Sequence, residues 1–180
     1  MKRILSLLPV FGLLIICIFF IWSFLHPRQA AFQKDQEIPA FEFPTLTQSS
    51  LTQEDITPPC FLVFFSTWCG KCSQILRSLS TYNLPIYTIA YHDTPPQIKK
   101  WKARYNITFL KEIAYDESGE TLKKLGLKRI PEVYLIATDR IIVWHNTGSL
   151  APHTLKNMTR EFASLFSEVS GPKGESYVQE

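Results

Sequence analysis

Apolar residues fall into short runs separated by polar segments over most of the chain beyond residue 38. The run at residues 61–66 has no helical period, a pattern typical of a strand buried on both faces. The next segment, residues 69–82, carries apolar side chains three and four positions apart, which indicates a helix. We therefore predict that the chain turns from strand to helix at Cys69.

Further strands and helices alternate along the rest of the chain. Only Thr138 and Asp139 separate the last two strands, so these should form an antiparallel hairpin. Right-handed crossovers would make the earlier strands parallel, with helices on both faces of the sheet. We predict a three-layer α/β domain with a mixed sheet. Its later elements are a strand at 86–91, a helix at 97–105, a weak strand at 112–116, a helix at 118–125, strands at 132–137 and 140–146, and a helix at 154–169.

The N-terminus has the features of a membrane anchor. Residues 4–25 contain no charge, and at about 1.5 Å per residue a helix of that length spans the ~30 Å hydrocarbon core. Lys2 and Arg3 precede the run, which places the N-terminus in the cytoplasm and the domain outside. A cleaved signal peptide is the alternative. We predict one N-terminal transmembrane helix, uncleaved.

Changes in composition along the chain divide it into four parts. An anchor at residues 1–25 is followed by a polar tether at 26–37, a folded domain at 38–169 and a disordered tail at 170–180. Within the domain, residues 38–46 look like an edge strand or an extended entry segment, and residues 48–59 like a polar loop.

Charge and histidine spacing exclude two classes of function. The formal charge is +3, from 19 basic and 16 acidic residues that are scattered along the chain, so nucleic-acid binding is not expected. His92, His145 and His153 show no paired spacing, and we predict no metal site.

The candidate chemistry lies in the cysteine pair Cys69 and Cys72. A thiol at a helix N-terminus ionises more easily, because free N–H groups and the helix dipole favour an anion there. Cys69 would attack a partner disulfide as the nucleophile, and Cys72, one turn later, would resolve the mixed disulfide. Lys71 adds a positive charge between them. We predict a redox-active dithiol.

Other uses of the pair fit less well. A zinc site needs a second ligand pair, and the remaining cysteines, Cys17 and Cys60, are isolated. Haem attachment needs a histidine after the second cysteine, where the chain has Ser73. A structural disulfide stays possible, although so small a loop removes little chain entropy. Cys60 is either a small buried apolar residue or a further redox thiol.

Two motifs carry a resemblance to a known family. Trp-Cys-Gly-Lys-Cys at residues 68–72 follows a hydrophobic strand, and Ile130-Pro131 precedes another, as in thioredoxin. The resemblance is more specific to one branch of that family, DsbE/CcmG, the membrane-anchored periplasmic thioredoxins of cytochrome c maturation. Its features here are the anchor, the inserted strand and helix, and the segment at residues 126–136. The resemblance covers about residues 38–166. It implies a thioredoxin-like fold that needs no cofactor beyond its redox-active disulfide.

The resemblance also implies roles for residues around the thiols. Pro131 would be cis, whereas from sequence alone it could be an ordinary strand-start proline. The backbone of Ile130 would then pair with an extended substrate, and Trp68 would shield the thiols. Glu132 matches the acidic residue that follows this proline in the branch. It is either a solvated strand-edge carboxylate or a group that tunes the thiols or the substrate contact.

Four residues depart from the family pattern. Val63 stands where thioredoxin has a buried Asp that helps proton transfer from the resolving thiol. Either water or Glu132 would do that work, or the pair would resolve more slowly. Lys128 and Arg129 occupy a region where branch members usually have a second glycine, and Lys71 replaces a proline. The departure at Lys128 and Arg129 weakens the assignment of a substrate within the branch, and the Gly70-Lys71 dipeptide influences the reduction potential.

The resemblance implies an inner-membrane protein whose domain faces the periplasm and acts as a dithiol reductant. Its substrate would be the haem-attachment cysteines of apocytochrome c, or a thiol protein of cytochrome maturation. A membrane electron donor of the DsbD/CcdA type would reduce it again. The alternatives are a dithiol oxidase of secreted proteins and a non-catalytic chaperone or haem-handling adaptor.

Overall fold

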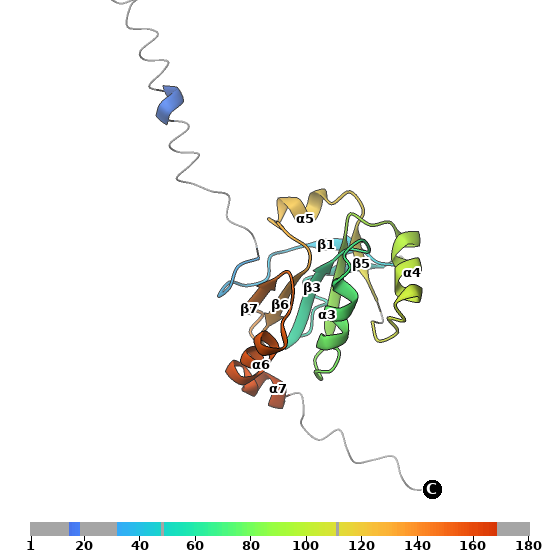
Figure 1. The fold of residues 1–180 in the computed structure, drawn as a ribbon. Helices are drawn as coiled ribbons and strands as arrows, with labels where there is room; N and C mark the ends of the chain where they lie inside the picture. The colour runs from blue at the N-terminus through green and yellow to red at the C-terminus, as the bar shows by residue number, and fades with distance from the viewer. Residues whose placement is uncertain (1–14, 19–31, 48, 111, 169–180) are drawn as a thin grey trace, which may run out of the picture.

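A five-stranded mixed sheet forms the centre of the computed structural model, which describes residues 15–18, 32–47, 49–110 and 112–168 (Figure 1). The strand order across the sheet is β5-β4-β3-β6-β7. The strands are β3 (Cys60–Phe65), β4 (Ile86–Tyr91), β5 (Ala114–Asp116), β6 (Glu132–Ile136) and β7 (Ile142–Thr147). Thus the strand predicted at 61–66 is the central one.

The sheet is parallel on one side of β3 and antiparallel on the other. β3, β4 and β5 run parallel, whereas β6 is antiparallel to β3 and β7 to β6. The predicted mixed sheet and hairpin are therefore confirmed. The connection within the hairpin is longer than predicted, because β6 ends at Ile136 and β7 begins at Ile142. All six residues of β3 are buried, in agreement with their unbroken apolar pattern.

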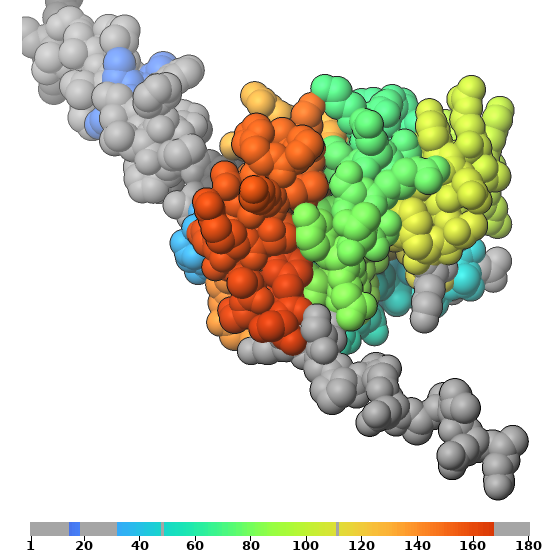
Figure 2. Space-filling model, turned by 60° about the horizontal axis from the view of Figure 1, so that its bottom comes forward, coloured from blue at the N-terminus to red at the C-terminus, as the bar shows by residue number. Residues whose placement is uncertain are grey.

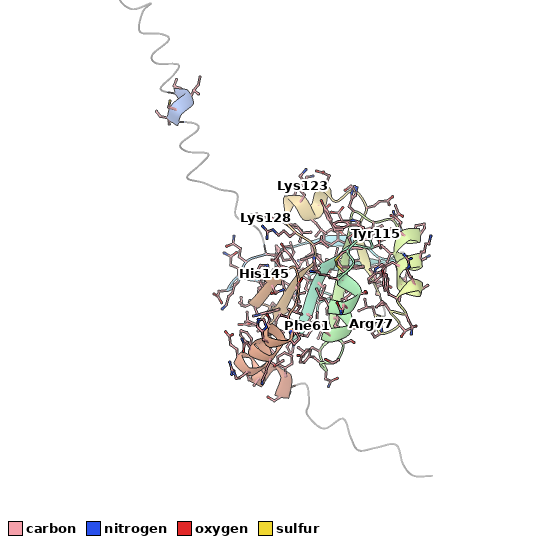
Figure 3. All side chains as sticks on the ribbon, in the orientation of Figure 1. Phe61, Arg77, Tyr115, Lys123, Lys128 and His145 are labelled. Carbon is pink, nitrogen blue, oxygen red and sulfur yellow. A yellow bond between two sulfur atoms is a disulfide. The ribbon has the colours of Figure 1, made fainter. Side chains whose placement is uncertain are left out.

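Four of the helices that the structure describes cover one face of the sheet. Figure 2 shows this face, with α6 and α7 in orange-red beside α3 in green. Their apolar side chains pack with Phe61, Val63 and Phe65 of β3 in one core cluster. The helix predicted at 154–169 is divided at Phe162, whose backbone leaves helical geometry. The helices are α3 (Cys72–Leu79), α4 (Pro95–Arg104), α6 (Pro152–Glu161) and α7 (Ala163–Glu168).

The opposite face carries α5 (Glu120–Lys124) and a small two-stranded sheet. That sheet pairs β1 (Glu42–Pro44) with β2 (Ser50–Thr52), the latter in a segment predicted as loop. A second core cluster lies here, in which the ring of Phe32 packs edge-on against Phe64 at 4.9 Å between centroids. Because side chains alternate along a strand, neighbouring residues of β3 and β6 belong to opposite clusters.

The N-terminal segment at residues 32–47 crosses this second face and bonds to both edges of the sheet. Asp35 donates its amide to the carbonyl of Ile142 in β7, and Glu37 bridges Ile141. At the other edge Thr45 bridges Ala114 of β5. Residues 32–37, expected to be tether, are therefore part of the domain.

The predicted anchor and tail lie mostly outside the described residues. Of the anchor only residues 15–18 are described, as a turn of helix, and the tail at 170–180 is not described. Within the described ranges no helix has the length and apolarity needed to cross a membrane.

Candidate active site

Cys69 and Cys72 form a disulfide just beyond the C-terminal end of β3. Their Cα atoms are 5.5 Å apart. The Cys69 amide donates to the carbonyl of Ser66 at 3.1 Å, and the Cys72 amide to that of Cys69 at 3.2 Å. These turns delay the helix, which begins at Cys72 with Lys71 as its N-cap. The prediction that the helix starts at Cys69 is thus wrong by one turn, whereas Cys72 does lie in its first turn.

The two sulfurs differ in their access to solvent. Cys72 is 1% exposed and belongs to the core cluster under α3, whereas Cys69 is only partly buried against that cluster. Beside it Trp68 is 65% exposed, more than any other large hydrophobic residue that the structure describes. Of the two cysteines, Cys69 is therefore the one partly open to solvent, beside the exposed indole of Trp68, whereas Cys72 is enclosed by the core.

Asp93 fixes the backbone that leads to the disulfide. It is 1% exposed and follows β4, and its Oδ2 accepts hydrogen bonds from the Ser66 hydroxyl at 2.9 Å and the Thr67 amide at 2.8 Å. Its Oδ1 accepts the Thr67 hydroxyl at 2.5 Å. Sequence reasoning missed this residue. The available signal was an aspartate directly after a parallel strand, where carboxyl ends of neighbouring strands meet.

The Ile130–Pro131 peptide is cis, as the family resemblance implies. Phe64 pairs with Glu132 in the antiparallel register, and continuing that register places Pro131 opposite Phe65. Ile130 packs against the same core cluster as Cys69. The proline thus lies at the sheet end from which the disulfide turn departs.

Lys71 connects the disulfide turn to the segment after β7. Its Nζ donates to the Ser149 hydroxyl at 2.7 Å, and the neighbouring Gly148 donates its amide to the Pro131 carbonyl at 2.8 Å. The lysine itself is exposed. Through these two bonds the residue between the cysteines and the cis-proline are held to one loop.

Glu132 is a buried carboxylate, 6% exposed, so the solvated alternative is excluded. The Tyr134 hydroxyl donates to its Oε2 at 2.5 Å. Burial, the hydrogen bond to Glu132 and the charge of that carboxylate all raise the pKa of Tyr134 above its ordinary range. The phenol therefore stays protonated and serves as the donor.

Glu132 lies on the opposite face of the sheet from Cys72. Val63 and Val133 pack in the cluster that contains Cys72, whereas Tyr134, two residues after Glu132, packs in the cluster of the other face. Since residues two apart on a strand share a face, the carboxylate of Glu132 points away from Cys72. Val63 itself is buried in the same core cluster as Cys72 and brings no polar group.

Cys60 is a core residue. It is fully buried at the start of β3, at the other end of the strand from the disulfide. Burial raises the pKa of its thiol to about 12, although the charge of Arg140 acts in the opposite direction. Such a thiol is inert at neutral pH.

No group of three or more His, Cys, Asp or Glu residues in the described part of the chain is arranged to hold a metal ion.

Comparison with known proteins agrees with this arrangement. The profile of the AhpC/TSA family matches residues 35–145, a span that includes the disulfide, Asp93 and Pro131. The chain belongs to the AhpC/TSA family. Proteins of this thioredoxin-like family usually work without a cofactor.

Several relatives share its length and its cysteine chemistry. A probable thiol:disulfide interchange protein DsbE-2 of Pasteurella multocida is 28% identical over 159 residues, covering 84% of each chain. DsbE of Escherichia coli K12 is 24% identical over 182 residues, covering 93% of this chain and 98% of its own. The chain is therefore a thioredoxin-like thiol:disulfide oxidoreductase that is similar to proteins named DsbE.

Solved structures support the fold. A Chlorobium tepidum protein assigned as DsbE superposes with a TM-score of 0.60 at 20% identity, covering 74% of this chain and 99% of its own. A thio-disulfide isomerase of Thermus thermophilus gives 0.57 at 15% identity, with 72% and 96% covered. These similarities confirm the thioredoxin-like α/β fold with a mixed sheet.

Proposed function

We propose that this chain is a dithiol reductant of cytochrome c maturation, held at the inner membrane by its N-terminal helix and facing the periplasm. The observation that carries the proposal is the asymmetric pair of sulfurs, with Cys69 accessible and Cys72 buried. A reductant of protein disulfides needs one sulfur for the partner and one that the partner cannot reach.

The reaction proceeds in two exchanges. In the reduced chain the Cys69 thiolate attacks one sulfur of a substrate disulfide, forming a mixed disulfide and releasing the other substrate sulfur as a thiolate that takes a proton. The Cys72 thiolate then attacks the Cys69 sulfur. This step forms the Cys69–Cys72 disulfide and releases the second substrate thiol. The substrate gains the two electrons that the chain loses.

The residues around the disulfide supply the substrate contacts. We assign the cis peptide before Pro131 to exposing the backbone of Ile130 as a pairing edge for an extended substrate, with Trp68 as an apolar surface beside it. Lys71 adds positive charge next to the Cys69 thiolate. Glu132 acts indirectly, because its bond with Tyr134 fixes the start of β6 next to Pro131.

The substrate we propose is the cystine of the apocytochrome c haem-attachment motif, or a thiol protein of the same maturation route. Attachment of haem needs two free thiols in a compartment that oxidises them, so a tethered reductant has a clear use there. The oxidised chain would be reduced again by a membrane thiol transporter of the DsbD/CcdA type.

The reduction potential of the Cys69/Cys72 pair tests the direction of electron flow. Full-length chain in detergent would be equilibrated with thiol buffers, and the oxidised fraction measured after alkylation. We expect a value below roughly −200 mV, on the thioredoxin and glutaredoxin side of the scale. A value near about −120 mV would indicate an oxidase and contradict the proposal.

A second assay tests the substrate. Reduced chain should reduce the disulfide of a Cys-x-x-Cys-His peptide in a single turnover. If cells carrying Ser at both Cys69 and Cys72 still mature cytochrome c, the chain is an adaptor and not a reductant.

A further inference from the structure

A small cavity opens next to the loop that precedes the disulfide. Its volume is about 230 Å³, and it lies between Thr67 and the exposed side of α4. Thr67 is two residues before Cys69, so their Cα atoms are at most about 7 Å apart. The cavity is lined by Thr67, Gln97, Lys100, Trp101, Arg104 and Tyr105.

The charged groups that line this cavity are both positive. Lys100 and Arg104 stand one turn apart on α4, and both are exposed. The carboxylate closest in the hydrogen-bond network, Asp93, is buried and accepts three hydrogen bonds from Ser66 and Thr67. Among the described residues no acidic side chain lines the cavity, and none forms an ion pair with Lys100 or Arg104.

The neutral groups add hydrogen-bond donors. The Oε1 atom of Gln97 accepts from the amide and hydroxyl of Thr94, each at 2.8 Å, which leaves its NH₂ group as the part with donors to offer. Trp101 is only 4% exposed, and its Nε1 has no acceptor within the described residues. The Nε1 atom itself is buried from solvent, so the donors that an anion in the cavity reaches are those of Lys100, Arg104 and Gln97.

We propose that this cavity binds a carboxylate side chain of the protein substrate, close to the disulfide that Cys69 attacks. The inference rests on the proposed reductase function and adds a preference for acidic sequence. A substrate strand rises about 3.3 Å per residue, so an acidic residue roughly two to four positions from the attacked cysteine would reach the cavity.

Single-turnover reduction of matched peptides tests this site. Each peptide holds one intramolecular disulfide and differs only in Glu or Gln at one position near the cysteines, scanned from one to five residues away. With reduced full-length chain we expect the best Glu peptide to react about three- to tenfold faster than its Gln partner, the range of an exposed or partly buried charge-assisted bond.

Two double variants separate the cavity from the overall charge. Lys100→Gln with Arg104→Gln should bring the Glu-to-Gln ratio to about one. Lys99→Gln with Lys156→Gln removes the same charge from exposed positions outside the cavity and should keep the wild-type ratio. A ratio near one in the wild type, or one that persists in the first double variant, would overturn the proposal.

An NMR readout follows the cavity directly. The indole N–H resonance of Trp101, assigned with Trp101→Phe, should shift in a mixed disulfide between the Cys72→Ser variant and the Glu peptide, and not in the one with the Gln peptide. The same spectrum for both peptides would count against the site. Reduction of both peptides at equal rates would remove the carboxylate site only, whereas reduction of neither would refute the reductase function itself.

Discussion

The two ends of β3 carry cysteines in opposite environments. Cys60 opens the strand, is fully buried, and has a pKa raised to about 12. Cys69 lies four residues past the other end, partly exposed in a turn beside Trp68. Both belong to one apolar stretch of sequence, yet only one can exchange disulfides. The place of a cysteine relative to the end of a buried strand thus decides between packing and chemistry.

The sharpest test of this contrast is to remove each thiol in turn. Cys69→Ser should abolish disulfide exchange, a loss of at least about a thousandfold, because Cys60 and Cys72 are buried and Cys17 lies in the predicted membrane anchor. Cys60→Ala should keep exchange within about twofold of the wild type. Single-turnover kinetics with a disulfide peptide would measure both. If Cys60→Ala lost disulfide exchange while its circular dichroism spectrum showed an intact fold, the claim that Cys60 serves only in packing would be wrong.

The buried partner sulfur should reveal itself by a trapped intermediate. In Cys72→Ser the first exchange proceeds and the second cannot, so the chain should accumulate one mixed disulfide with substrate at Cys69. Mass spectrometry of the unreduced complex would measure it. A Cys60→Ala background controls for attack by that thiol; an adduct mapped to any other residue would be inconsistent with the assigned roles.

Replacing Asp93, whose carboxylate holds the loop between β3 and the disulfide, should have a smaller effect on disulfide exchange. Asp93→Ala leaves two hydroxyls and the Thr67 amide without their acceptor, which should cost about 1–3 kcal/mol of folding stability and slow exchange roughly tenfold. Asp93→Asn keeps one acceptor oxygen, so its folding stability and exchange rate should lie between those of the wild type and of Asp93→Ala. Denaturant unfolding and exchange rates would be compared, and unchanged exchange would show that the loop needs no such support.

The smallest expected effect concerns Cys60, at the opposite end of β3, and the folding stability at alkaline pH. Since the pKa of Cys60 is raised in the folded chain, its contribution to stability is complete below about pH 9 and is lost as the pH rises towards 12. Wild type should therefore lose stability more steeply than Cys60→Ala over this range, by up to about 1.4 kcal/mol per pH unit. Chemical unfolding of the oxidised proteins, in which Cys69 and Cys72 do not titrate, would measure the slopes; equal slopes would contradict the burial of this thiol proton.

The fold and the thiol pair could be predicted because their signals are local. The strand at 61–66, the spacing of Cys69 and Cys72, and the short connection of the hairpin each depend on neighbouring residues. The pairing of β1 with β2 could not be predicted, since it joins short, largely polar segments. Asp93 looked like a loop residue because its partners lie 26 and 27 positions away. The burial of Glu132 is accompanied by a hydrogen bond from Tyr134. Tyr134 is two residues later on the same face of the strand, so the sequence did offer a partner for a buried carboxylate.

The segment at residues 32–47 has a consequence for how copies of the chain avoid one another. Outer strands of a sheet offer unpaired N–H and C=O groups on which another chain can add a strand. Here the same segment bonds to β7 at Ile142 and bridges β5 at Ala114, so it occupies part of both outer strands at once. It therefore leaves fewer unpaired backbone groups on the outer strands to which a second copy of the chain could add a strand.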